Sequence, residues 1–177
     1  ALATLWALGP LLGALAATLA AGMTATTLIL AAEANIAKTD AMLAGLTTLA
    51  FGAWIRRLTG AGVTGLHPAP PGIPPEETPG RGALALILWG ALGLAALVKG
   101  PITPMALAGA VAWVSAVRRD GAALRALGLR TWGPLLFLAV ALPWYVAIAI
   151  RTEGAFFLEA VGRDLLGKLA EGRESHG

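Results

Sequence analysis

Residues 82–119 read GALALILWGALGLAALVKGPITPMALAGAVAWVSAVRR, and this stretch decides the fold. Two runs without a charged residue, 82–98 and 100–117, lie on either side of Lys99, and Arg118-Arg119 closes the second run. A helix that crosses a bilayer needs about 20 predominantly apolar residues. The stretch therefore predicts two antiparallel membrane-spanning helices, at 82–98 and 101–118, joined by a tight turn at Lys99-Gly-Pro.

The whole chain shares this apolar character. Of its 177 residues, 57% are hydrophobic and only 13% are charged, and the mean hydropathy is +0.74. A soluble domain has roughly 45–50% apolar and about 25% charged residues. The composition excludes an intrinsically disordered chain and an ordinary soluble globule. The absence of cysteine excludes disulfides, thiolate metal sites and a cysteine nucleophile.

Three further spans are expected, at about 11–31, 38–57 and 131–150, which makes five in all. Gly9-Pro10 is expected to divide the uncharged N-terminal run, because proline interrupts helical hydrogen bonding. The fold class predicted is an all-α, polytopic membrane helix bundle within residues 1–153.

Two segments fall outside the spans. Six prolines lie in 58–81, which predicts an irregular cytoplasmic loop. Residues 154–177 combine apolar residues four apart with charges between them, which predicts an amphipathic juxtamembrane helix followed by a polar loop.

The basic residues predict the orientation. Lysine and arginine next to spans gather on the cytoplasmic side of a bacterial inner membrane. One side of the predicted bundle collects Arg56, Arg57, Arg81, Arg118, Arg119, Arg125 and Arg130. We place that side in the cytoplasm, with Arg56 and Arg57 snorkelling to the interface. The net charge of +3 is thus explained by membrane orientation, and no nucleic-acid partner is predicted.

On the other, extracytoplasmic side, Lys38, Asp40 and Lys99 are expected to converge at the mouths of helices. Ionisable residues at membrane depth usually face a cavity or a partner. Two lysines suit a phosphate-bearing lipid headgroup, and Asp40 can orient a sugar hydroxyl or a lysine. A purely structural interpretation stays open: Asp40 can cap a helix and the lysines can snorkel.

Other polar residues on that side are secondary candidates. Glu33 either begins the same polar segment or ends the preceding helix. Arg163 and Lys168 are candidate substrate-binding residues, although i,i+4 pairs with Glu159 and Asp164 give them a structural interpretation. Glu174 and His176 are weak candidates for a divalent metal, the sole cofactor considered, because two ligands do not make a site.

Signatures of soluble enzymes, such as a Walker motif or G-x-S-x-G, are absent from the sequence. Five segments instead resemble, in order and spacing, a bacterial family of lipid-dependent glycosyltransferases. They are AEANIAKTDAML (32–43), LVKGPI (97–102), LPWYV (142–146), FFLEAVGRDLLGKL (156–169) and ESHG (174–177). The family comprises the ArnT-like aminoarabinose transferases and the related protein mannosyltransferases.

The resemblance implies a GT-C fold and an inverting transfer of sugar from a polyprenyl phosphate to a lipid A-like or protein acceptor. It implies that the principal catalytic base lies in an outer loop upstream of Ala1, so that this chain is an internal fragment. Asp40 then matches a supporting acidic residue, Lys99 the lysine of a Lys-Gly-Pro turn, and Arg163 a position that reaches the donor phosphate. Where aminoarabinose transferases often have Glu-His, this chain has Glu159-Ala160, which leaves the donor sugar open.

Two other classes of function remain alternatives. A lipid or solute transporter would use aspartate and lysine as an ion relay, with broken helices as its gate. A non-catalytic membrane subunit would use the polar segment at 33–40 only for structure.

Overall fold

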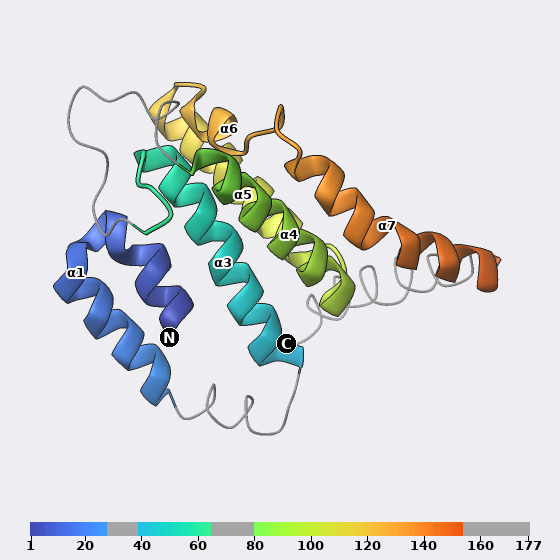
Figure 1. Ribbon diagram of the computed structural model, residues 1–177, viewed down its shortest axis with the longest axis horizontal. Helices are drawn as coiled ribbons and strands as arrows, with labels where there is room; N and C mark the ends of the chain where they lie inside the picture. Colours follow the sequence, from blue (N-terminus) through green and yellow to red (C-terminus); the bar gives the residue numbers. More distant parts are fainter. Residues whose placement is uncertain (28–38, 65–79, 154–177) are drawn as a thin grey trace, which may run out of the picture. The chain divides into compact units, whose positions relative to one another are not determined.

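The computed structural model describes residues 1–27, 39–64 and 80–153, and all regular secondary structure in these ranges is helical (Figure 1). The elements are α1 (Leu2–Thr26), α3 (Thr39–Thr59), α4 (Arg81–Lys99), α5 (Ile102–Arg118), α6 (Ala122–Ala126) and α7 (Gly133–Arg151). The chain divides into two compact units, Ala1–Val140 and Ala141–Gly177. The predicted all-α class is confirmed for the described residues, helices occur at each predicted span, and several of them have the length and apolar character of membrane-spanning segments.

The predicted number of five spans is not supported. Three helices in the described part of the chain are long and apolar enough to cross a membrane: α1, α4 and α7. Helix α5 has 17 residues, which give a length of only about 25 Å. Helix α3 has 21 residues, but Asp40, Arg56, Arg57 and several threonines lower its hydrophobicity.

Helix α1 is broken at Gly13 and not, as predicted, at Gly9-Pro10. Pro10 lies inside the helix, whereas Gly13 has φ 75° and ψ 172°. Only glycine adopts this backbone conformation readily, so the chain reverses there. Figure 1 shows the two arms, Leu2–Leu12 and Ala14–Thr26, diverging from the break. The arms are about 16 and 20 Å long, so each alone is shorter than the bilayer core, and α1 reaches the length of a membrane span only when both arms are counted together.

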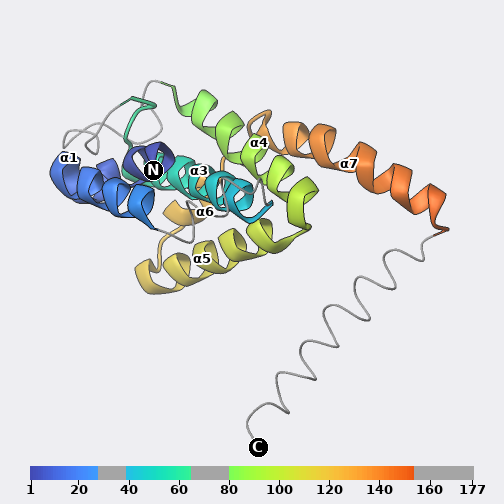
Figure 2. The ribbon, with the colours of Figure 1, turned by 90° about the horizontal axis from the view of Figure 1, so that it is seen from below.

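Helix α3 is the centre of the first unit. It packs against α1 on one side and against α4, α5 and α6 on the other (Figure 2). Ala50 and Trp54 of α3 join Leu84, Leu88 and residues of α5 and α6 in one buried apolar cluster. On the side of α1, Gly52 lies so close to Ala7 that an added Cβ would be 2.7 Å from the Ala7 Cβ. Small residues on α3 therefore permit the close approach of α1.

The turn between α4 and α5 has the predicted form. Helix α4 ends at Lys99, and α5 begins at Ile102. Gly100 adopts φ 69°, and its N–H donates to the carbonyl of Ala96, which closes the last turn of α4. A positive φ at this point favours glycine, as at many helix C-termini. The Lys99-Gly-Pro sequence thus sets where α4 ends.

The first turns of α7 pack against α4 within the first unit. The rings of Trp89 and Phe137 meet edge to face, with centroids 6.0 Å apart, and Val140 fills the space above Gly93. In α5, α7 and the second arm of α1, many large apolar side chains are exposed, including Leu15, Trp113, Leu135 and Ile150. Such exposure is unusual for a soluble protein and typical of surfaces that face lipid.

Candidate functional site

Asp40 and Lys99 meet at one end of the first unit. Asp40 lies in the first turn of α3, and Lys99 lies in the last turn of α4. Lys99 Nζ donates to Asp40 Oδ1 in an ion pair between residues 59 positions apart. The predicted convergence of these two side chains is therefore present in the structure.

The helices favour this arrangement of charge. A helix carries partial positive charge at its N-terminus and partial negative charge at its C-terminus. Asp40 complements the N-terminus of α3, and Lys99 complements the C-terminus of α4. Each charge is thus stabilised by its own helix as well as by its partner.

Both members of the pair remain accessible. The Lys99 side chain is 45% exposed and that of Asp40 is 53% exposed. An ammonium group has three N–H donors, of which the ion pair uses one. The pair can therefore meet an anionic group from outside while Asp40 holds Lys99 in place.

A polar contact that the sequence analysis missed fixes the helices below the pair. The hydroxyls of Thr47 in α3 and Thr103 in α5 are 2.8 Å apart, and Thr103 is 1% exposed. Thr47 lies two helical turns beyond Asp40 in α3, and Thr103 lies in the first turn of α5, directly after the Lys99-Gly-Pro turn. This hydrogen bond connects α3 to the start of α5, next to the turn that carries Lys99. The only feature of the sequence that pointed to the contact is the seven-residue spacing of Thr47 from Asp40, which places the two residues on the same face of a helix.

The remaining predicted site residues lie outside the described residues. Glu33 and Lys38 fall in 28–38, and the following fall in 154–177: Arg163, Lys168, Glu174 and His176. Within the described ranges, no group of three side chains suited to hold a metal ion occurs. The predicted metal ligands therefore remain a prediction.

Arg56 and Arg57 lie at the opposite end of the first unit, and the prediction that they snorkel to the membrane interface is wrong. Arg56 is 0% exposed and Arg57 is 3% exposed. Arg56 Nη1 donates to the carbonyl of Gly62 at 2.6 Å, and its guanidinium lies 4.5 Å from the centre of the Trp6 ring. Arg57 Nε donates to the carbonyl of Ala126 at 2.6 Å. The guanidinium groups are buried because main-chain carbonyls of neighbouring segments satisfy their donors.

Tryptophan side chains add three bonds of the same kind at this end. Their indole N–H groups donate across the unit: Trp6 to the carbonyl of Val63 at 2.7 Å, Trp54 to that of Ala123 at 3.0 Å, and Trp89 to that of Leu127 at 2.9 Å. We call this set of donors, of which Trp54, Arg56 and Arg57 are buried and Trp6 and Trp89 half-buried, the anchored end. In the sequence, the only feature that pointed to the anchored end is the position of Trp54 close to Arg56 and Arg57.

Comparisons of the chain with protein-family models, with curated proteins and with solved structures found no match. The geometry and the sequence pattern alone therefore carry the functional argument.

Proposed function

We propose that the protein is an integral-membrane glycosyltransferase that moves a sugar from a polyprenyl phosphate to a lipid or protein acceptor at the extracytoplasmic face. The proposal rests on one observation: the accessible Asp40–Lys99 ion pair, which lies where α3 begins and α4 ends. The sequence resemblance of the two segments that hold these residues supplies the reaction class.

The proposed chemistry places a cation where negative charge develops. The acceptor attacks the anomeric carbon, the bond between that carbon and the phosphate oxygen breaks, and polyprenyl phosphate leaves with the electron pair. Lys99 stabilises the charge that grows on the leaving phosphate. A general base takes the proton of the acceptor.

Asp40 is proposed as the residue that positions Lys99. Its carboxylate accepts from Lys99 Nζ, so it holds the ammonium group at the helix mouth. The second carboxylate oxygen can accept a hydroxyl of the donor sugar. The pair is exposed at one end of the unit, which supports binding of a headgroup over an ion relay. A relay would require a continuous series of ionisable groups leading from this pair through the interior.

The test is transfer of radiolabelled sugar from a polyprenyl phosphate in membranes that contain the protein. Lys99→Ala should lower the rate about 100-fold, as expected for loss of one charge-stabilising donor. Lys99→Arg should retain part of the rate because it retains the charge. Glu153→Gln, which neutralises an exposed carboxylate elsewhere, is the control and should leave the rate unchanged. Parental rates in both Lys99→Ala and Asp40→Asn would contradict the proposed roles.

A further inference from the structure

Residues 118–132, which we call the basic segment, carry most of the exposed positive charge in the described part of the chain. The segment includes α6 and ends at the start of α7. It holds Arg118, Arg119, Arg125 and Arg130 against a single acid, Asp120, so its net charge is four minus one, or +3. All four arginines are exposed.

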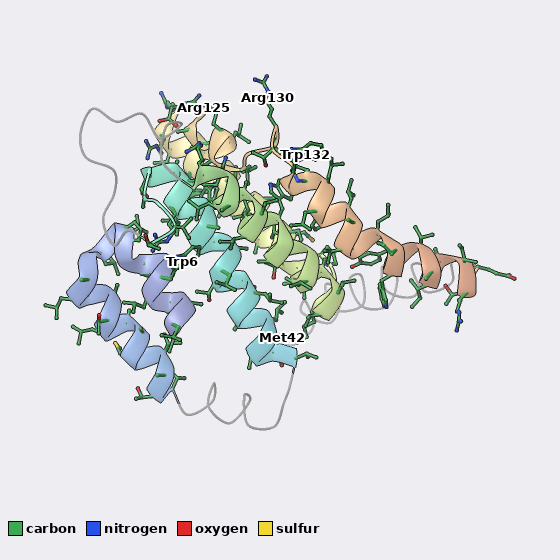
Figure 3. The ribbon with its side chains drawn as sticks, viewed as in Figure 1. Trp6, Met42, Arg125, Arg130 and Trp132 are labelled. Carbon is green, nitrogen blue, oxygen red and sulfur yellow. The ribbon has the colours of Figure 1, made fainter. Side chains whose placement is uncertain are left out.

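Large apolar side chains are exposed beside these arginines. Leu124 is 52% exposed, Leu129 is 58% exposed, and Trp132 is 78% exposed. Figure 3 shows Arg130 projecting away from the helices, with Trp132 at the start of α7. Arginine beside exposed leucine and tryptophan is typical of protein surfaces at the boundary between headgroups and acyl chains.

The other face of the basic segment is fixed to the helices. Ala123 and Ala126 are buried, and the carbonyls of Ala123, Ala126 and Leu127 accept from Trp54, Arg57 and Trp89 of the anchored end. These bonds hold the segment in one conformation. The exposed arginines are thus presented without the cost of ordering a loop upon binding.

The position of the segment along the chain identifies its surroundings. Helix α7, which is long and apolar enough to cross a membrane, begins at Gly133 directly after Trp132. The basic segment therefore lies where a membrane-crossing helix meets the surface. An RNA would also attract arginines, but the exposed Leu124, Leu129 and Trp132 favour a lipid.

We propose that residues 118–132 form a binding surface for anionic phospholipid headgroups. The guanidinium groups of Arg119 and Arg130 bind the lipid phosphates, because arginine matches phosphate oxygens with two parallel hydrogen bonds. Leu129 and Trp132 contact the upper part of the acyl chains. The surface lies at the opposite end of the first unit from Asp40 and Lys99 and does not depend on the proposed transfer reaction.

Asp120 limits the strength of this surface. Its carboxylate accepts from the N–H of Ala122 at 3.0 Å and from Arg118 Nε at 3.2 Å. The Ala122 N–H, together with the nearby Arg118 and Arg125, lowers the pKa of Asp120, so it stays ionised near neutral pH. Replacing it with asparagine keeps an acceptor for Ala122 and removes the negative charge.

The test is native mass spectrometry of the purified protein in neutral detergent, titrated with phosphatidylglycerol and, separately, with phosphatidylcholine. The parent protein should bind phosphatidylglycerol more tightly. Each arginine near a membrane surface is worth about a fivefold change in affinity, so Arg119→Gln/Arg130→Gln should weaken phosphatidylglycerol binding about 30-fold. Asp120→Asn should strengthen it about fivefold.

Arg151→Gln is the matched control, because it neutralises another exposed arginine outside residues 118–132, in the last turn of α7, and should weaken binding far less than the double variant. Circular dichroism and thermal unfolding establish that the double variant is folded. The proposal is overturned by equal affinity for the two lipids, by unchanged affinity in the folded double variant, or by an equal loss in Arg151→Gln.

Discussion

Arg56 binds the main-chain oxygen of Trp6 through two donors, Nε at 3.0 Å and Nη2 at 2.5 Å. In an unbroken helix that oxygen would accept the N–H of residue 10, but residue 10 is proline and has no N–H. The guanidinium of Arg56 in α3 thus replaces the one hydrogen bond that proline removes from α1. This exchange explains both why Arg56 is buried and why Pro10 is tolerated inside a helix.

The first prediction concerns the hydrogen bonds from Arg56 to the main-chain oxygen of Trp6. Arg56→Lys should lower the free energy of unfolding by about 2 kcal/mol, because lysine provides no paired donors and leaves a buried carbonyl poorly satisfied. In a Pro10→Ala background, the same substitution should cost about 1 kcal/mol less, because the restored N–H of residue 10 can bond Trp6. Unfolding by sodium dodecyl sulfate in mixed micelles, followed by circular dichroism, measures each variant.

The control for this cycle is Arg130→Lys, which alters an exposed arginine and should change the stability by less than about 0.5 kcal/mol. Equal costs of Arg56→Lys in the two backgrounds would mean that Arg56 and Pro10 act independently.

The second prediction concerns the break in α1. Gly13→Ala should destabilise the protein by about 1–3 kcal/mol, because its backbone conformation is strained for any residue with a Cβ. Gly22 lies in the same element and, like Gly13, has no atom within 4 Å of an added Cβ, but its φ is not positive. Gly22→Ala should therefore be neutral or stabilising by up to about 1 kcal/mol. A neutral Gly13→Ala variant would argue against a break at this residue.

The third prediction concerns the contact between α1 and α3. Gly52→Ala places a Cβ 2.7 Å from the Cβ of Ala7 and 2.8 Å from the ring of Trp6. The two helices must separate, which should cost about 1–3 kcal/mol. Gly45 lies in the same helix with open space beside it, so Gly45→Ala is the control and should not destabilise. The same unfolding assay distinguishes the two, and equal effects would contradict the close approach.

The fourth prediction separates structure from function in the Asp40–Lys99 pair. The exchange Asp40→Lys/Lys99→Asp restores an ion pair but places each charge at the unfavourable end of its helix. Its stability should fall by about 1–2 kcal/mol, from the two reversed helix-terminus interactions. Glycosyl transfer should be lost although the variant remains folded, because the ammonium group has moved from α4 to α3. Parental transfer activity in the exchanged variant would show that the pair acts only as a structural contact.

The sequence predicted the parts of the fold that depend on local pattern. The uncharged runs and the Lys99-Gly-Pro turn set the bounds of α4 and α5 within one or two residues. Alternation of the spans was enough to place Asp40 and Lys99 at the same end. These features follow from which residues are neighbours along the chain.

The parts that sequence analysis missed depend on distant main-chain atoms. An arginine at the end of an apolar helix is expected to reach for water, but Arg57 is buried because the carbonyl of Ala126, 69 residues away, accepts its N–H. The acceptor is a main-chain oxygen, so the identity of Ala126 gives no indication of this contact. Likewise, the carbonyl freed by Pro10 is satisfied by Arg56, and the reversal of the chain occurs where φ turns positive, at Gly13.

The bonds from the anchored end to the basic segment all end on main-chain carbonyl oxygens, which every amino acid carries. Substitutions at the exposed positions of this segment, such as Leu124, therefore leave these attachments intact, whereas changes at Trp54, Arg57 or Trp89 remove one. A change of side chain therefore breaks this connection only when it falls on a donor. Among related chains, the donors would stay constant while the exposed residues of the segment that they hold diverge with the membranes in which each chain works.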